Sequence, residues 1–242
     1  MRNIKISYQY DGSDFFGFQR QPKQRTVQGE MERSLGIILQ EKIDLISSGR
    51  TDRGVHALEQ VSNFQTPSTI PKEKLFYALS RSLPEDIVLL SLEEVEEDFH
   101  ARFTAKTRTY CYKIHWKRNP FLHRYESYVK QEIDAEAFQA ILKPFLGKHN
   151  FQNFRLQDDA FVNPIREIYS ISCRKKEEGI ELLIQANAFL KSQIRIMIGT
   201  ALEVYFGRME KTRIEEMLEN PGKTFPKVLA PAAGLYLFKI EY

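Results

Sequence analysis

The sequence predicts an α+β fold of mixed helices and strands, built from two ferredoxin-like β-α-β-β-α-β halves. Three observations favour it: apolar residues alternate where strands are expected, helical stripes of apolar residues lie between them, and this order occurs twice. We expect an N-terminal domain over residues 1–98 and a C-terminal domain over residues 99–242. Two such halves would place a cleft between their antiparallel sheets.

The first half follows the β-α-β-β-α-β order directly. Residues 4–10 alternate apolar and polar side chains, as a half-buried strand does. Thr26 can cap a helix that carries Val27, Met31 and Leu35 on one face. The elements expected after this helix are a strand at 43–47, a strand through Val61 and Phe64, a helix opened by Pro71 at its first position, and a strand at 87–92.

The second half repeats the order with larger insertions, although the two halves share no residue pattern. Asp134 can cap its first helix and Gly147 can stop it, while Gly207 follows its second helix. Its expected elements are strand 107–116, a strand within 124–130, a helix through Phe138 and Leu142, strands 165–173 and 180–186, a helix from Ile194 to Tyr205, a short helix with a capping box at 212–215, and strand 235–242.

Composition excludes several classes of protein. The chain has 242 residues, 42% hydrophobic and 28% charged, which is a globular balance. Its two cysteines cannot supply a disulfide framework or a cysteine-based zinc site. No apolar run approaches the roughly 18 residues of a membrane span, and we therefore expect a soluble, cytoplasmic protein.

The net charge of +3 hides a sharp asymmetry along the chain. Residues 85–98 hold seven acids and no Lys or Arg, whereas residues 99–130 hold eight Lys or Arg residues, one acid and eight aromatic residues. Cations can meet phosphates and rings can stack on bases, so the second stretch favours binding to single-stranded or looped nucleic acid. The alternative is a strand pair whose aromatic side chains fill the core.

The segment at 49–57, Gly-Arg-Thr-Asp-Arg-Gly-Val-His-Ala, is the strongest candidate for chemistry. Asp52 lies between Arg50 and Arg53, and a nearby guanidinium favours the ionised carboxylate. Such a carboxylate can act as a nucleophile, a base or a metal ligand. The simpler alternative is a turn aspartate bonded to its own backbone, and His56 has no obvious partner in the sequence.

This segment resembles the GRTD-x-GVHA signature of the tRNA pseudouridine synthase A family. Further motifs agree in order over essentially the whole chain. They are Tyr10-Asp-Gly12 with Phe15, Gly17 and Gln19; Thr26-Val-Gln28; Phe99-His-Ala-Arg-Phe103; Arg108-Thr-Tyr110; Gly147-Lys-His-Asn-Phe151; Phe189-Leu190 with Gln193-Ile-Arg195 and Met197-Ile-Gly199; Ala230-Pro231; and Gly234-Leu-Tyr-Leu237. Phe18, Arg53 and Glu59 depart from the family pattern, since tryptophan, alanine and a small residue are usual there.

The resemblance implies an isomerase that converts uridines of the tRNA anticodon arm to pseudouridine, without metal or organic cofactor. It also implies a homodimer, in which the two ferredoxin-like halves of each subunit face each other across a central RNA-binding cleft. The family's aspartate falls on Asp52, its loop arginine on Arg50, its helix arginine on Arg195 and its stacking tyrosine on Tyr110. We expect three further substrate contacts, from Leu235, Arg53 and His56, with Leu235 in an apolar wall that keeps water from the freed sugar.

Two other functions remain open at this point. The chain could be a non-catalytic RNA-binding protein of two ferredoxin-like modules, in which Asp52 is a turn residue. It could also be a metal-dependent nuclease that uses Asp11, Asp14 and Asp52 to hold a divalent ion. Tyr110 and Arg195 have simpler readings too, as a core residue and a surface ion pair.

Overall fold

The computed structural model describes residues 1–157 and 162–242, which form two compact units. Unit 1 comprises Met1–Lys106 together with Tyr236–Tyr242, and unit 2 comprises Thr107–Leu235. Unit 1 therefore includes the final strand, which the sequence analysis assigned to the C-terminal half. Each unit combines helices with a mostly antiparallel sheet, which confirms the predicted mixed class. The ferredoxin-like description of the two halves stays a prediction.

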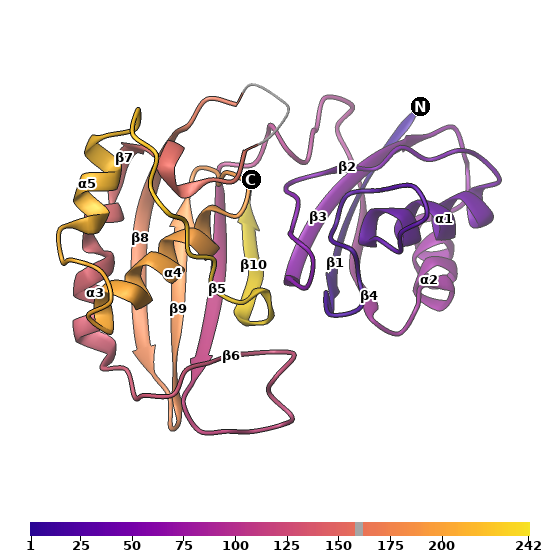
Figure 1. Cartoon of the computed structure of the whole chain (residues 1–242). Coiled ribbons are helices and arrows are strands. Elements are labelled where there is room, and N and C mark those ends of the chain that lie inside the picture. The colour runs from indigo at the N-terminus through magenta and orange to yellow at the C-terminus, as the bar shows by residue number, and fades with distance from the viewer. Residues whose placement is uncertain (158–161) are drawn as a thin grey trace. The chain divides into compact units, whose positions relative to one another are not determined.

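Unit 1 is a sheet with two helices against it (Figure 1). Its elements are β1 (Arg2–Tyr10), α1 (Val27–Leu39), β2 (Ile46–Ser47), β3 (His56–Thr66), α2 (Lys72–Ser82), β4 (Ile87–Val95) and β10 (Leu235–Glu241). The strands follow the order β4-β1-β3-β10, and β2 pairs with β3. Strand β1 is antiparallel to both β3 and β4, whereas β10 runs parallel to β3. The expected β-α-β-β-α-β order of residues 1–98 is present.

The side-chain pattern of unit 1 explains these elements. Ile4, Ile6 and Tyr8 on β1 are fully buried, as the alternation predicts. The hydroxyl of Thr26 accepts a hydrogen bond of 3.3 Å from the Gly29 N–H and so caps α1. Pro71 is the N-cap of α2 and not its first helical residue. The predicted start of this helix was therefore wrong by one residue, because the extended backbone of Pro71, with ψ 140°, lies outside the helix.

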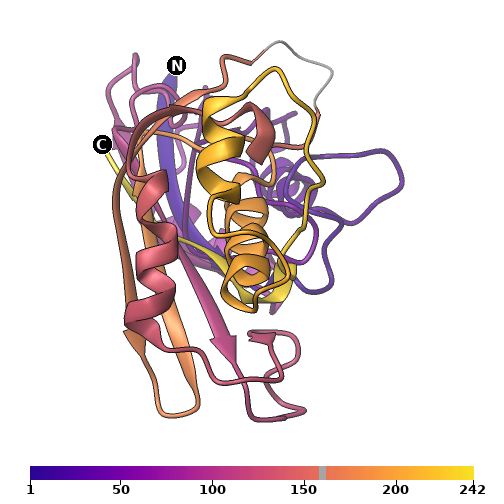
Figure 2. The ribbon, with the colours of Figure 1, turned by 60° about the vertical axis from the view of Figure 1, so that its left-hand side comes forward.

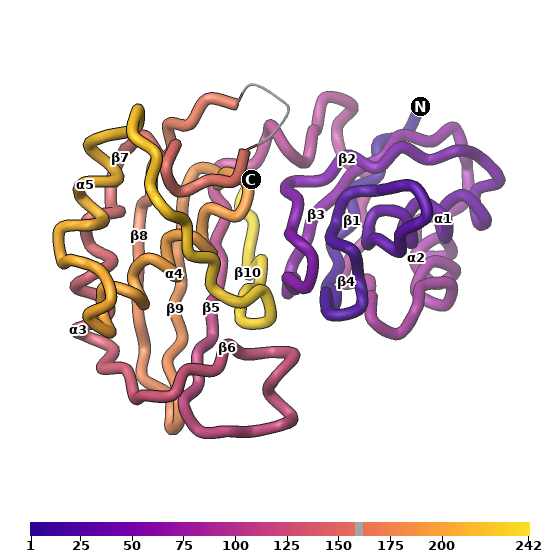
Figure 3. The backbone as a smooth tube through the Cα atoms, in the orientation of Figure 1, coloured from indigo at the N-terminus to yellow at the C-terminus, as the bar shows by residue number. Residues whose placement is uncertain are grey.

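The chain returns to unit 1 through β10, whose path Figure 3 shows. Tyr236 and Leu237 pair with His56 and Ala57 at the start of β3. Farther along, the Lys106 N–H donates to the Glu241 carbonyl at 2.8 Å. The return therefore places a late segment of the sequence beside the loop that precedes β3.

Unit 2 consists of antiparallel strands and the helices that pack on them. Its elements are β5 (Thr107–His115), β6 (Ser127–Tyr128), α3 (Ala135–Leu142), β7 (Gly147–Asn150), β8 (Ile165–Lys175), β9 (Gly179–Ala186), α4 (Gln193–Tyr205) and α5 (Arg213–Glu219), with 3-10 turns at Lys143–Phe145, Gln152–Phe154 and Ala232–Gly234. The strand order is β5-β9-β8-β7, and β6 pairs in parallel with β5. Helices α3, α4 and α5 pack together, in the foreground of Figure 2.

Most of the expected elements of unit 2 are confirmed, with two differences. Asp134 caps α3 by accepting a hydrogen bond of 2.7 Å from the Ala137 N–H, and Gly207 adopts a positive φ of 69° after α4. Strand β7 was not predicted. The capping box at 212–215 was wrong: Thr212 has helical dihedral angles and forms no side-chain cap, and its hydroxyl donates instead to the Glu216 carboxylate at 3.0 Å.

No helix within residues 1–157 or 162–242 has both the length and the apolar character that crossing a bilayer requires.

Candidate functional site

The segment singled out from the sequence is the loop between β2 and β3, which we call the signature loop (residues 49–56). Its first residue is held from β3, where the buried Gln60 side chain donates to the Gly49 carbonyl at 3.0 Å. Gln60 in turn accepts a 2.6 Å hydrogen bond from the Ser48 hydroxyl. No motif in the sequence pointed to Gln60. A polar side chain at a buried strand position was the available signal, because such a group needs a partner.

The middle of the signature loop is a tight turn. The Val55 N–H donates to the Asp52 carbonyl at 3.1 Å, and Gly54 has a φ of 77°, a conformation that favours glycine. Thr51 is anchored twice: its hydroxyl shares a 2.8 Å hydrogen bond with the Tyr10 hydroxyl, and its carbonyl accepts one of 3.1 Å from the Phe18 N–H. Asp52 lies on this turn and is half-buried. The hydrogen bonds of Thr51 and Val55 fix the backbone on both sides of Asp52.

Two glycines outside the loop allow it to lie close to the chain that follows β1. A Cβ added at Gly12 would lie 2.0 Å from the Val55 carbonyl oxygen, which is a severe clash with backbone. Gly17 has a φ of 88°, and a Cβ there would meet the Arg53 N and the Thr51 carbonyl oxygen at 3.3 Å. Gly12 and Gly17 thus let the backbone of the signature loop pack closely against the chain that follows β1. We call these two residues the glycine bed of the loop.

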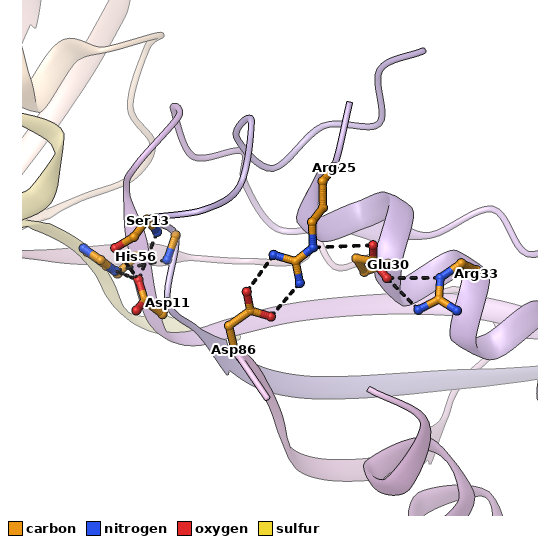
Figure 4. Close-up of polar contacts among 8 residues, drawn as sticks. Asp11, Ser13, Arg25, Glu30, Arg33, His56 and Asp86 are labelled. Atoms are coloured by element: carbon orange, nitrogen blue, oxygen red, sulfur yellow. Dashed lines mark hydrogen bonds and ion pairs between the residues drawn. The ribbon is translucent and has the colours of Figure 1, made fainter. Parts of the chain in front are cut away.

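His56 ends the loop and is buried, with 2% of its surface exposed. Its Nδ1 atom accepts a hydrogen bond of 3.1 Å from the Gly12 N–H. The same atom lies 3.1 Å from the Asp11 carboxylate (Figure 4). The ring also stacks on Tyr236 of β10, with centroids 4.7 Å apart. His56 therefore fixes the loop end, the Gly12 turn and the last strand together.

The arginines near the loop have different surroundings. Arg25 donates two hydrogen bonds, of 2.7 and 2.8 Å, to Asp86 and lies 3.6 Å from Glu30 (Figure 4). The hydrogen bonds to Asp86 raise the pKa of Arg25 above its ordinary value. Arg50 and Arg53 are exposed, and neither forms an ion pair within the part of the chain that the structure describes.

Unit 2 holds the other three predicted site residues. Tyr110 lies on β5 with 8% of its surface exposed, and its ring meets Phe189 edge to face at 5.2 Å. Arg195 lies in the first turn of α4, where its Nε donates to the Ala230 carbonyl at 2.9 Å and its own carbonyl accepts from the Ala230 N–H at 2.9 Å. Leu235, which directly precedes Tyr236, is buried.

The acidic stretch (residues 85–98) and the basic, aromatic stretch (residues 99–130) each contain side chains that stabilise the fold, and the second also contains exposed rings. In the acidic stretch, Asp86, Glu93 and Glu94 pair with Arg25, Lys5 and Arg2 of unit 1. In the basic stretch, Tyr110 and Tyr112 are core residues, as the alternative predicted for such aromatics, whereas Phe103 and Phe121 are 77% and 83% exposed. Ring surface for a ligand is therefore confined to a few members of the stretch.

No group of three or more His, Cys, Asp and Glu side chains with metal-binding geometry exists among the residues that the structure covers. Asp11 instead accepts hydrogen bonds from the Ser13 backbone and hydroxyl, at 2.9 and 2.6 Å. This local turn accounts for Asp11 without the metal ion that the nuclease alternative requires.

Comparison with known proteins identifies the family. A solved archaeal box H/ACA sRNP Nop10-Cbf5 complex contains a chain that matches with a TM-score of 0.39 and 11% identity, over 83% of this chain and 42% of that one. Two curated relatives match along 100% of both chains: tRNA pseudouridine synthase A of Acetivibrio thermocellus, at 39% identity, and tRNA pseudouridine synthase A 2 of Clostridium perfringens, at 37%. The family model described as tRNA pseudouridine synthase matches residues 6–104 and 141–242. The family model and the two curated relatives confirm the predicted resemblance, and the chain belongs to the tRNA pseudouridine synthase family.

Proposed function

We propose that this chain isomerises uridines in the anticodon arm of tRNA and that the Asp52 carboxylate is the group that acts on the ribose. Membership of the family gives the reaction class, which is conversion of uridine to pseudouridine in tRNA. The observation that carries the assignment of Asp52 is the signature loop itself. It holds one half-buried carboxylate on a turn fixed by Thr51, Val55 and the glycine bed.

The chemistry explains why a fixed carboxylate suffices. Isomerisation breaks the bond between N1 of uracil and C1′, turns the base and joins C5 to C1′. C5 then loses its proton and N1 gains one, so no atom is gained or lost overall. An ionised carboxylate can add to C1′ and later leave it, or it can take the C2′ proton to give a glycal and return that proton afterwards. Deuterium at C2′ of the target uridine distinguishes these routes, because only proton removal gives a primary isotope effect.

The target nucleotide must leave its stack before a carboxylate can reach its sugar. Extrusion costs a few kcal/mol in a duplex and less in a loop, which favours an anticodon arm as substrate. We assign Tyr110 to stack on the extruded base, a contact worth about 1–3 kcal/mol, and Arg195 to pair with the carboxylate. Arg50, Arg53 and His56 are assigned to the substrate, and Leu235 to the apolar wall. The sequence motifs support these roles.

The fold and assembly expected for the family belong to the same proposal. The strand order β4-β1-β3, with β2 beside β3, supports a ferredoxin-like description of residues 1–98. A homodimer and a cytoplasmic location rest on the family resemblance. Light scattering on the purified protein tests the first, and fractionation of cells tests the second.

Substitution of Asp52→Asn tests the assignment, because asparagine keeps the size and hydrogen bonding of the side chain but removes its charge. We expect the variant to bind tRNA within about threefold of the unsubstituted protein while pseudouridine formation falls by about 10³-fold or more. Asp44→Asn is the matched control, since Asp44 is an exposed carboxylate 3.6 Å from Arg20 and is not part of the signature loop. Turnover retained by Asp52→Asn would refute the assignment.

A further inference from the structure

Two adjacent aromatic residues of unit 1 are each covered by an arginine. The guanidinium carbon of Arg25 lies 4.1 Å from the centre of the Phe15 ring, and that of Arg53 lies 4.1 Å from the centre of the Phe16 ring. Phe15 is 1% exposed, whereas Phe16 is 39% exposed. The distance is the same in the two cation–π pairs, but the Phe15 ring is interior and the Phe16 ring lies at the surface.

The two pairs differ in how the arginine charge is balanced. Asp86 occupies the donors of Arg25 with two hydrogen bonds, so this arginine joins two parts of unit 1. Arg53 has no carboxylate partner within residues 1–157 and 162–242, and it is exposed. A guanidinium carries five N–H donors in one plane. The guanidinium carbon lies over the Phe16 ring and the side chain is exposed, so these donors can reach a ligand.

The Arg53–Phe16 pair is held in place by the backbone around it. The Phe16 N–H donates to the Arg25 carbonyl at 2.8 Å, and its own carbonyl accepts from the Gln21 side chain at 3.1 Å. On the other side, Gly17 lies against the Arg53 backbone. The Phe16 ring therefore restricts the Arg53 side chain before a ligand binds. Less side-chain entropy is then lost on binding.

We propose that the Arg53–Phe16 pair binds a phosphate of the tRNA strand beside the uridine on which Asp52 acts. The inference rests on the proposed function, because Arg53 directly follows Asp52 in the turn. A nucleotide that reaches the carboxylate brings its flanking phosphates to the neighbouring residue. A planar guanidinium with open edge donors matches two phosphate oxygens, which an ammonium does not do. Arginine at this variable position of the signature thus adds a contact with the phosphate backbone of the tRNA.

Substitution of Arg53→Gln tests the contact, with the salt dependence of tRNA binding as the readout. We expect KM for tRNA to rise about tenfold, as loss of one charge-assisted contact implies. The slope of log affinity against log salt should become shallower by about 0.7, the value for one phosphate in a single strand. Arg53→Lys should keep the slope but recover only part of KM. Phe16→Leu should also keep the slope and raise KM, because the Arg53 cation remains but is no longer held by the aromatic ring.

The matched control is Arg81→Gln on α2. Arg81 lies 5.6 Å from the ring centre of the exposed Tyr77 and donates to its hydroxyl at 2.8 Å, so it is also an arginine beside a surface ring. We expect its KM and slope to match those of the unsubstituted protein. A normal KM and slope for Arg53→Gln would overturn the proposal, and so would a raised KM with an unchanged slope, which indicates contact with a base. If the unsubstituted protein forms no pseudouridine, the proposed function fails instead.

Discussion

Gly12 offers a direct test of whether the bed of the signature loop controls the reaction. A Cβ at this position would lie 2.0 Å from the Val55 carbonyl oxygen, and ordinary contact begins at 3.4 Å. Gly12→Ala must therefore drive the two backbone segments apart by about 1.4 Å. A displacement of about 1 Å in catalytic groups costs on the order of 10²-fold in rate. We expect kcat for pseudouridine formation to fall by about that factor.

The assay is single-turnover formation of pseudouridine in a tRNA transcript, with tRNA affinity and circular dichroism measured on the same samples. Gly49→Ala is the control, because a Cβ at this loop position meets nothing within 4 Å, and it should leave kcat unchanged. A folded Gly12→Ala protein with kcat within threefold of the unsubstituted protein would refute the reasoning. Should Gly12→Ala fail to fold, Gly17→Ala gives a milder displacement, since its contacts are 3.3 Å.

The other predictions concern stability and thiol chemistry. Thr26→Ala should lower the free energy of unfolding, measured by urea denaturation, by about 1 kcal/mol, because α1 loses its cap. Thr212→Ala should lower it much less, because Thr212 makes no side-chain cap. Equal losses for the two variants would contradict the capping argument. Burial raises the pKa of Cys111 to about 12 and that of Cys173 to about 11. At pH 8 about one Cys111 thiol in 10⁴ is ionised, so alkylation by iodoacetamide should be slow in native protein, fast in denaturant, and about tenfold faster for each pH unit gained. Native labelling as fast as in denaturant would show that the thiols are not buried.

Local patterns predicted the elements whose signals are local. The alternation of β1 and the caps at Thr26 and Asp134 depend on residues a few positions apart, and the structure confirms them. Strand β7 is four residues long and consists of Gly-Lys-His-Asn, so it has no apolar alternation to detect. The capping box at 212–215 had the correct letters. Whether Thr212 lies inside or outside the helix depends on backbone angles that those letters do not determine.

The candidate site shows the same division. The GRTD motif located the signature loop, because its residues are contiguous in the sequence. The partners that hold the loop, such as Gln60 and the bed at Gly12, come from other elements and become visible only when the strands pair. The stacking of Arg53 on Phe16 joins residues 37 positions apart. Contacts of this kind depend on register and loop path, which no periodicity encodes.

The return of β10 to unit 1 has a consequence for how the protein is made. The ribosome completes residues 1–106 early, but β10, which supplies the Tyr236 ring beneath His56 and the acceptor for Lys106, is translated only after all of unit 2. Until β10 is made, the edge of β3 that pairs with β10 stays without its partner. An unpaired strand edge can pair with the wrong strand. Nascent chains stalled before residue 236 should therefore depend more on chaperones than released ones do. The order of synthesis thus delays the contacts of His56 with β10 until β10 itself has been translated.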